Sequence, residues 1–396
     1  MKYIIIVPDG MADHPIESIG GKTPLEVAVT TNMDHMAQNG LIGCVQTIPD
    51  EFSPGSDIGN MSILGYDPQT YHTGRAPLEA ANLNILLNDD EVIFRCNLTT
   101  IYEDHMADYS AGHISTKEAN EIIQSLNKQI KYEGIEFFTG KSYRHLLKMK
   151  VKEPKAFTKI KTVPPHDILK KNIKSYLPKG ADTEMLLKIM EQAKAILDEH
   201  PVNQVRADLK ENPANSIWLW GQGTRPYFPP FKEKYGLSGA MISAVDLVNG
   251  IGRLADLEII DVPGITGYYD TNFAGKAEYA IKALERHDFV YVHIEAPDEA
   301  GHNGDLNEKI KAIENIDKHI VGAILNQFDQ NNARILVLPD HPTPVEIRTH
   351  THEPVGFVMY GTGVKQDGDH VFNEVTAQEK GVLFNSGPAL MEYFTK

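Results

Sequence analysis

The sequence predicts an α/β protein: a doubly wound sheet with a smaller α+β domain inserted into it. Short β-branched runs bounded by Pro, Gly and Asp occur near both ends of the chain and are typical of buried parallel strands. A region of different texture separates these two groups of strands. The length of 396 residues also exceeds the size at which a single hydrophobic core usually stops growing, which favours two domains.

The first 65 residues predict a β-α-β unit. We expect a strand over Ile4–Val7, a helix over Thr23–Asn39 that stops at Gly40, and a second strand over Ile42–Ile48. A loop rich in Ser, Pro, Gly and Asp follows at positions 53–57 and leads into a helix from Ile58 to Leu64.

From about Thr73 the pattern changes to α+β, and strong β/α alternation resumes only after about Asn215. The simplest architecture is a discontinuous core domain of residues 1–72 and 215–396, with an inserted domain of residues 73–214. The inserted domain is expected to contain strands over Glu91–Thr100, Ile135–Phe138 and Arg144–Lys150, and helices over Ser115–Gln129 and Thr183–His200.

The composition indicates a cytoplasmic globular protein. The hydrophobic fraction of 41% and the charged fraction of 23% are ordinary for that class. Two cysteines, Cys44 and Cys96, argue against a disulfide scaffold and fit a reducing compartment. No apolar run approaches the roughly twenty residues of a membrane span, and a net charge of −16 disfavours nucleic acid or an anionic membrane as a partner.

The negative charge is unevenly distributed. Between Lys141 and Lys179 there are twelve Lys or Arg and two acids, so this stretch carries 12 − 2 = +10, and the rest of the chain carries −16 − 10 = −26. Such a run is either a solvated basic face or a lid that brings positive charge to an anionic substrate.

Side chains that commonly bind metals lie beside the predicted strands of the core domain. Asp9 follows the strand at 3–7, Asp298 and His302 follow the strand at 289–294, and Asp340-His341 follows the strand at 335–338; His350 precedes the strand at 355–360. The carboxyl ends of parallel strands are where ligands gather in an open α/β sheet. Carboxylates mixed with imidazoles suit a divalent cation such as Mn²⁺ or Zn²⁺.

Each of these residues also has a purely structural explanation. Asp9 alone would be a turn residue, and Ser56 before a helix would be an N-cap. Asp298 and His302, four residues apart, would form a surface ion pair. Asp340-His341 is harder to explain in this way, because two adjacent titratable groups at a buried strand end need partners. Their shared position at strand ends favours a metal site.

The chain resembles the archaeal-type, cofactor-independent phosphoglycerate mutases of the alkaline phosphatase superfamily. The similarity spans essentially the whole chain, and an alkaline-phosphatase-like fold is therefore expected. The matching segments are 5–13, 54–60, 64–68, 73–79, 95–98, 143–147, 164–167 and 296–302, with the pair Asp340-His341.

The resemblance implies two divalent metal ions and no 2,3-bisphosphoglycerate. Asp298, His302 and His350 would hold one ion; the other would be held by Asp9, Asp340, His341 and Ser56. His350 is assigned rather than His352 because it lies four residues before Pro354, as the family pattern requires, which leaves the role of His352 open. Mn²⁺ and Zn²⁺ are expected first, and Mg²⁺ and Co²⁺ also accept these ligands.

The implied reaction interconverts 3-phosphoglycerate and 2-phosphoglycerate through a phosphoserine at Ser56. Arg144 and Lys276 are the candidate catalytic groups that bind phosphate or carboxylate, and His113 and His166 are candidates to contact the substrate and move protons. The partner would be a small anionic phosphorylated substrate, and the inserted domain would be a lid that excludes water. The oligomeric state is left open.

One segment departs from the family pattern. Where these mutases carry Arg-Gly-Ala-Gly, this chain has Trp-Leu-Trp-Gly-Gln-Gly at 218–223. A Trp cannot replace the bidentate grip of an arginine on phosphate or carboxylate. This variant resembles a bacterial branch proposed to act as homoserine kinase, so a phosphotransferase with a nucleotide donor is the alternative function. A non-catalytic protein that binds metal or phosphate is a further alternative.

Overall fold

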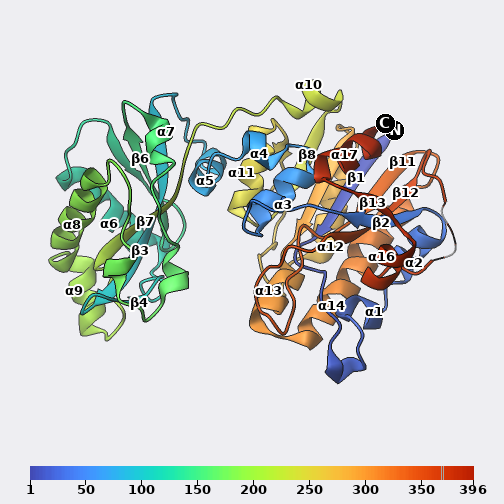
Figure 1. Cartoon of the computed structure of the whole chain (residues 1–396), viewed down its shortest axis with the longest axis horizontal. Coiled ribbons are helices and arrows are strands. Elements are labelled where there is room, and N and C mark those ends of the chain that lie inside the picture. Colours follow the sequence, from blue (N-terminus) through green and yellow to red (C-terminus); the bar gives the residue numbers. More distant parts are fainter. Residues whose placement is uncertain (367, 369) are drawn as a thin grey trace. The chain divides into compact units, whose positions relative to one another are not determined.

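The computed structural model describes residues 1–366, 368 and 370–396. It divides into two compact units (Figure 1). Unit 1 comprises Met1–His72 and Tyr227–Lys396, and unit 2 comprises Thr73–Pro226. The predicted end of the inserted domain at residue 214 is therefore wrong. Strand β7 (Ser216–Thr224) pairs along β3 (Glu91–Tyr102), which keeps it in unit 2.

Unit 1 is built on an eight-stranded sheet in the order β13-β2-β12-β11-β1-β10-β8-β9. Its buried apolar strands satisfy their backbone groups through this ladder. The strands are β1 (Lys2–Pro8), β2 (Leu41–Val45), β8 (Gly239–Ile242), β9 (Glu258–Ile259), β10 (Phe289–Ile294), β11 (Ala333–Val337), β12 (Val355–Gly361) and β13 (Val382–Phe384).

Strand β12 runs antiparallel to both of its neighbours, β11 and β2. The prediction of a parallel strand is wrong here, because an alternating or apolar run does not encode strand direction. The reversal has a consequence for the site. Residues that precede β12 lie at the same edge of the sheet as residues that follow β1, β10 and β11.

Helices cover both faces of this sheet. On one face α2, α12 and α14 pack against alternate strand residues such as Ile4, Val290 and Ile335. On the other face lies α3, which packs with α11 and α17. The helices are α1 (Pro24–Val27), α2 (Thr31–Gln38), α3 (Ser56–Ile63), α4 (Pro68–Tyr71), α10 (Phe231–Tyr235), α11 (Asp246–Leu254), α12 (Phe273–Ala283), α13 (Ala296–Asn303), α14 (Leu306–Ile316), α15 (Gly322–Gln327), α16 (Glu374–Lys380) and α17 (Gly387–Thr395), with η1 (Glu17–Ile19) and the π-helical turn η4 (Asp317–Val321).

The predicted helix over 23–39 is two short helices, α1 and α2. The backbone is extended at Ala28, where α1 ends. The carboxylate of Asp317 then accepts the main-chain N–H groups of Asn32 (3.1 Å) and Met33 (2.8 Å) at the start of α2. A cap supplied from 285 residues away is a tertiary contact that the local sequence does not show.

Unit 2 is an antiparallel sheet in the order β4-β3-β6-β5, with β7 also paired to β3. Its other strands are β4 (His105–Asp108), β5 (Ile135–Phe138) and β6 (Arg144–Lys150). The helices are α5 (Arg75–Asn82), α6 (Thr116–Gln129), α7 (Pro154–Phe157), α8 (Glu184–Asp198) and α9 (Pro201–Asp208), with the 3-10 turns η2 (Pro165–Ile168) and η3 (Ile173–Ser175).

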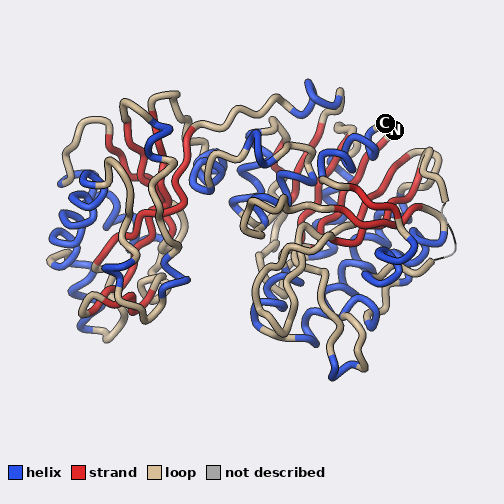
Figure 2. Tube along the Cα trace, viewed as in Figure 1, coloured by secondary structure: helices blue, strands red, loops and turns tan. Residues whose placement is uncertain are grey.

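The two faces of the unit 2 sheet differ in chemistry. The long helices α6 and α8 lie along one side of the strands (Figure 2) and pack on alternate β3 residues, including Phe94 and Cys96. The intervening residues Arg95 and Asn97 lie on the opposite face with β7 residues. In neither unit is any described helix long and apolar enough to cross a membrane.

Candidate metal and phosphoryl-transfer site

The seven predicted metal-site residues come together at one edge of the unit 1 sheet. Three of them follow the ends of β1 and β11, and two more are on α13, the helix that follows β10. His350 precedes the reversed strand β12, and Ser56 is the first residue of α3. The residues are Asp9, Ser56, Asp298, His302, Asp340, His341 and His350.

Asp298, His302 and His350 form one compact group. Nε2 of His302 lies 3.2 Å from Oδ2 of Asp298, and Nε2 of His350 lies 3.4 Å from Oδ1 of the same carboxylate. The two Nε2 atoms are 2.9 Å apart. The three side chains that the family resemblance groups together thus lie close to one another, and the ligand set remains a prediction.

Asp9, Asp340 and His341 form a second group. Nε2 of His341 lies 3.5 Å from a carboxylate oxygen of Asp9 and 3.5 Å from one of Asp340. All three side chains are fully buried. His341 connects the two groups, because its ring centroid is 4.0 Å from that of His350 and its ligand atom also lies within 4.8 Å of those of Asp298 and His350.

Ser56 belongs to the second group rather than to the helix cap. Gly55 occupies the N-cap position of α3, and no side chain caps this helix. Oγ of Ser56 instead lies 3.4 Å from Oδ2 of Asp9 and 3.2 Å from Nε2 of His341. The hydroxyl is therefore directed at the group of buried carboxylates and imidazoles.

The residues present fit a divalent cation. Oδ1 of Asp9 is buried and has no hydrogen-bond partner among the described residues. Burial and the neighbouring Asp340 carboxylate raise the pKa of Asp9 well above its usual value. Buried carboxylates are costly without a compensating positive charge. Mixed carboxylate and imidazole donors are a ligand set that Mn²⁺, Zn²⁺ and related ions accept.

Two further residues, His293 and Glu295, extend the second group and were not predicted. Nε2 of His293 lies 2.9 Å from Oδ2 of Asp9 and 3.8 Å from Oε2 of Glu295. Burial and then the Asp298 carboxylate raise the pKa of Glu295 to about 8. A polar residue at the carboxyl end of a buried apolar strand is the signal that could have identified both.

Polar neighbours fix the carboxylates in place. Asn60 donates to Oδ2 of Asp340 at 2.7 Å, and the hydroxyl of Tyr291 donates to Asn60 at 2.6 Å. Thr343 donates to Oδ1 of Asp298 at 2.5 Å. These contacts hold the donor atoms in one arrangement, which favours metal affinity.

Lys276, predicted to contact phosphate or carboxylate, is buried behind this site. Its side chain is 1% exposed, and Nζ donates to the main-chain oxygen of His293 at 2.6 Å. Burial lowers its pKa to about 8, an effect that Glu295 opposes. The only hydrogen bond that its ammonium group forms with a described residue is this main-chain bond, so Lys276 supports the end of β10.

The other three predicted substrate residues lie in unit 2, along a line of ring contacts. The rings of His113 and Tyr143 are 6.2 Å apart, and Cζ of Arg144 lies 5.4 Å from the Tyr143 ring. His166 lies 5.6 Å from the Trp220 ring. Tyr109 connects the two ends, at 5.9 Å from Tyr143 and 6.1 Å from His166.

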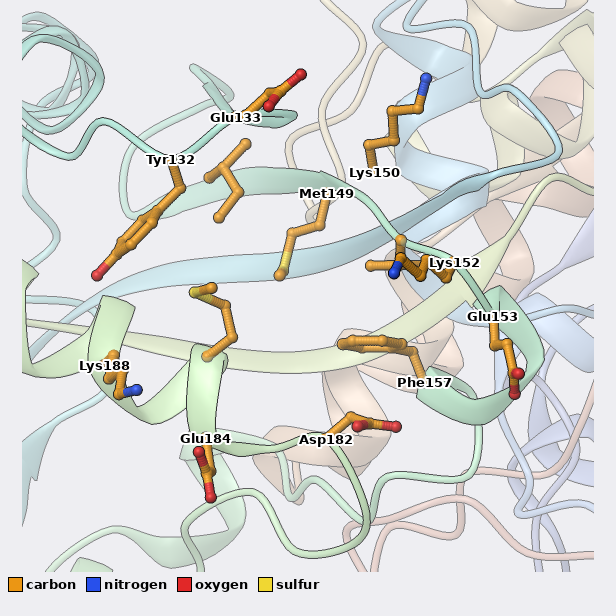
Figure 3. A pocket seen from close by; sticks show the side chains of 13 residues that line it. Tyr132, Glu133, Met149, Lys150, Lys152, Glu153, Phe157, Asp182, Glu184 and Lys188 are labelled. Carbon is orange, nitrogen blue, oxygen red and sulfur yellow. The ribbon is translucent and has the colours of Figure 1, made fainter.

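Unit 2 also has a wide groove that none of the predicted site residues lines (Figure 3). Its volume is about 960 Å³, and it lies between β6 and the start of α8. Both acidic and basic side chains line it, among them Glu133, Lys152 and Glu184. The groove has neither a metal-binding group nor a charge excess that would select a ligand.

Relatives that match nearly the whole chain are described as phosphoglycerate mutases. A family model for 2,3-bisphosphoglycerate-independent phosphoglycerate mutase matches residues 37–203. The chain is 50% identical over 383 residues to the 2,3-bisphosphoglycerate-independent phosphoglycerate mutase of Methanothrix thermoacetophila, covering 96% of each. It is 46% identical over 398 residues to a probable enzyme of that description from Geobacter sulfurreducens, covering 99% of each.

Two solved structures resemble the whole chain. A protein of Pyrococcus horikoshii superposes with a TM-score of 0.83 at 29% identity, covering 100% of this chain and 97% of that one. The cofactor-independent phosphoglycerate mutase of Thermoplasma acidophilum gives 0.67 at 27% identity, covering 100% and 99%. The chain therefore belongs to the 2,3-bisphosphoglycerate-independent phosphoglycerate mutases.

Proposed function

We propose that this protein interconverts 3-phosphoglycerate and 2-phosphoglycerate by passing the phosphoryl group through Ser56, with two divalent metal ions in unit 1. The observation that carries the proposal is the position of the Ser56 hydroxyl, within 3.4 Å of both Asp9 and His341 and uninvolved in capping its helix. The relatives named as phosphoglycerate mutases support the substrate.

The proposed ligands fall into the two groups described above. Asp298, His302 and His350 would hold one ion, and Asp9, Asp340, His341 and Ser56 the other. Bound divalent ions stabilise charge on a transferring phosphoryl group and lower the pKa of a coordinated hydroxyl. Mn²⁺ and Zn²⁺ are the first candidates for this donor set.

In the forward reaction, Oγ of Ser56 attacks phosphorus and loses its proton. The bond between phosphorus and the C3 oxygen of the substrate breaks, and that oxygen takes up a proton. The glycerate then reorients, its C2 hydroxyl attacks the phosphoserine, and Ser56 regains its hydroxyl. Every bond formed is matched by one broken, so no nucleotide or 2,3-bisphosphoglycerate is consumed.

Residues outside the metal groups would position the substrate. We assign substrate contact to Arg144, His113 and His166, which share the line of ring contacts in unit 2. Arg144 would bind an anionic group, and the two imidazoles could exchange protons near neutral pH. Lys276 would act through the main chain of His293 rather than by contact. A lid role for unit 2 is part of this proposal.

The test is turnover without nucleotide. Purified protein loaded with Mn²⁺ is incubated with 3-phosphoglycerate, and 2-phosphoglycerate is followed by coupled enolase. We expect activity in the parent protein, none in Ser56→Ala, and full activity in Ser53→Ala, which alters an exposed serine three positions earlier in the same loop. A phosphoryl adduct that maps to Ser56 in acid-quenched parent protein would identify the nucleophile.

If the parent protein with metal bound forms no 2-phosphoglycerate, the mutase reaction is refuted. Phosphorylation of homoserine by ATP in the same preparation would then support the nucleotide-dependent alternative. Full activity in Ser56→Ala would refute the phosphoserine while leaving the mutase reaction in place.

A further inference from the structure

Two arginines of unit 2 lie beside one tryptophan ring, and a third lies on the same face of the sheet. Cζ of Arg95 lies 4.0 Å from the centroid of the Trp220 ring, and Cζ of Arg75 lies 6.0 Å from it. Arg144 pairs with Asn97, two residues along β3 from Arg95, so it lies on the same face of the sheet. Arg75, Arg95 and Arg144 are called the arginine cluster below.

The arginine cluster shares a single carboxylate. Glu79 binds Arg95 through two contacts of 3.1 Å. Within the described chain, neither Arg75 nor Arg144 forms an ion pair, and Nε of Arg75 is buried without a hydrogen-bond partner. Burial and repulsion from Arg75 and Arg144 lower the pKa of Arg95 to about 10, although Glu79 opposes this effect. Among the described residues, Arg75 and the exposed Arg144 therefore have aromatic neighbours but no carboxylate partner.

Neighbouring guanidinium groups of this kind destabilise the folded protein when no anion is bound. A buried N–H without an acceptor costs roughly 1–3 kcal/mol, and like charges at close range repel. The cost is unusual in a chain with a net charge of −16, which offers many carboxylates. A planar guanidinium with free N–H groups matches the two oxygens of a carboxylate or phosphate.

Trp220 forms the rigid base of the arginine cluster. Its Nε1 donates to Oδ1 of Asn97 at 3.1 Å, and its side chain is 4% exposed. The next residue, Gly221, has a φ of +60°, and a Cβ there would lie 3.4 Å from Arg95 Cδ and 3.6 Å from Arg75 Cβ. The turn at Gly221 thus lies directly against both arginines.

Two residues of the arginine cluster lie beside the segment at 218–223, which departs from the family pattern. That segment has no arginine, yet two guanidinium groups lie near its Trp220 ring. They belong to Arg75 on α5 and Arg95 on β3, and Arg144 is on β6. Trp220 of β7 therefore lies beside arginines contributed by other elements.

We propose that the arginine cluster is a binding site for a small molecule bearing a carboxylate or phosphate group, with Arg75 as its principal ligand beside Trp220. The site extends the proposed function, because phosphoglycerates carry both groups. Only the identity of the natural ligand rests on that function; the anion site itself rests on the unpaired guanidinium groups.

Trp220 provides a direct reporter. Trp218 and Trp220 are the only tryptophans, so Trp218→Phe leaves Trp220 as the single indole. In this background, with a chelator present to exclude binding through metal ions in unit 1, the fluorescence is titrated with D-glycerate, inorganic phosphate and 3-phosphoglycerate. We expect saturable changes, and a Kd raised about 10- to 100-fold by Arg75→Gln, the loss of one charged bidentate contact.

Two variants serve as controls. Arg75→Lys keeps the positive charge but lacks the planar guanidinium that can bind two oxygens at once. It should weaken binding less than Arg75→Gln. Arg225→Gln removes an exposed arginine of the same unit that pairs with Asp89, and should leave Kd unchanged. Circular dichroism checks the fold, and if Arg75→Gln does not fold, an unchanged Kd in Arg75→Lys overturns the proposal.

The outcomes separate the two proposals. An unchanged Kd for all three anions in folded Arg75→Gln overturns the anion site, even if the protein isomerises phosphoglycerate. Arg75-dependent binding in a protein that does not isomerise phosphoglycerate supports the site and refutes the proposed function. Binding of glycerate but not phosphate identifies a carboxylate site, and the converse identifies a phosphate site.

Discussion

Nε2 of His293 lies 2.9 Å from Oδ2 of Asp9, and both side chains are fully buried. Burial lowers the pKa of His293 to about 4, so the imidazole is neutral at pH 7. Nδ1 lies 3.2 Å from the Ser243 hydroxyl, whose oxygen accepts the main-chain N–H of Val245. This network assigns the proton to Nε2, where it is donated to Asp9. His293 therefore orients a proposed metal ligand.

We expect His293→Leu to weaken Mn²⁺ binding by about 10- to 100-fold, the usual loss when the partner of a metal ligand is removed. His293→Gln, which retains an N–H that can reach Asp9, should lose less. Calorimetric titration with Mn²⁺ measures both. Equal affinity in the parent and in His293→Leu would show that Asp9 does not depend on His293.

The fold could be predicted from sequence where the pattern is local. Hydrophobic periodicity and the usual turn residues were enough to predict the strand at 4–7 and the polar residues at strand ends. The reversed direction of β12 and the pairing of β7 with β3 did not follow, because pairing depends on contacts across more than a hundred residues. The segment at 216–224 was accordingly assigned to the wrong domain.

In the candidate site, too, local patterns could be predicted from the sequence and long-range contacts could not. Asp9 and Asp340 could be selected because carboxylates directly after apolar strands need partners. His293 was overlooked because it continues an apolar strand, where one polar residue resembles an ordinary core histidine. Lys276 is predicted to bind phosphate or carboxylate, and a sequence alone does not show that its ammonium group donates to the main chain of His293. The contact of Arg75 with Trp220 joins residues whose sequence positions give no hint of it.

Chelation should abolish activity and lower thermal stability together. A ligand that binds only the folded state stabilises it by about 2.7 kcal/mol at a concentration of 100 Kd. We expect added Mn²⁺ to restore activity and to raise the unfolding temperature measured by circular dichroism. Asp298→Asn should reduce the shift, whereas Asp208→Asn, an exposed change in unit 2, should not. A Mn²⁺-independent unfolding temperature would contradict a structural metal site.

A buried ion pair supports the loop that carries the metal groups. Nζ of Lys309 lies 2.7 Å from Oδ2 of Asp13 and donates to the main-chain oxygen of Thr343 at 2.8 Å. Both charged side chains are almost fully buried. Thr343 in turn donates to Asp298. The pair thus connects protein stability to the position of a proposed metal ligand.

Lys309→Met should lower the free energy of unfolding by about 3–5 kcal/mol, because it leaves the Asp13 carboxylate buried and unpaired. Adding Asp13→Asn should restore part of that loss. Lys311→Met, an exposed lysine two positions away that pairs with Glu308, should change stability by less than about 0.5 kcal/mol. Urea unfolding measures the free energy of unfolding of Lys309→Met, Asp13→Asn, the double variant and Lys311→Met. If the double variant loses as much free energy as the two single variants together, the two side chains do not stabilise the protein as a pair.

His145 gives unit 2 a dependence on pH. Its side chain is 1% exposed, Nδ1 accepts the main-chain N–H of Gly140 at 3.1 Å, and Nε2 has no partner among the described residues. Burial lowers its pKa to about 4 from the usual 6.5. Between these values the unfolded chain binds more protons than the folded one, so this contribution to stability is complete above pH 6.5 and is lost as pH falls toward 4.

Lowering the pKa of His145 from 6.5 to about 4 corresponds to about 3 kcal/mol of stability. We expect the free energy of unfolding of unit 2 to fall between pH 7 and pH 4.5, and to fall less in His145→Asn, whose amide oxygen can still accept an N–H. His105→Asn, an exposed histidine of the same unit, should keep the parental slope. Both tryptophans lie in unit 2, so their fluorescence follows its unfolding in guanidinium. Identical slopes in the parent and in His145→Asn would mean that His145 takes up its proton without unfolding.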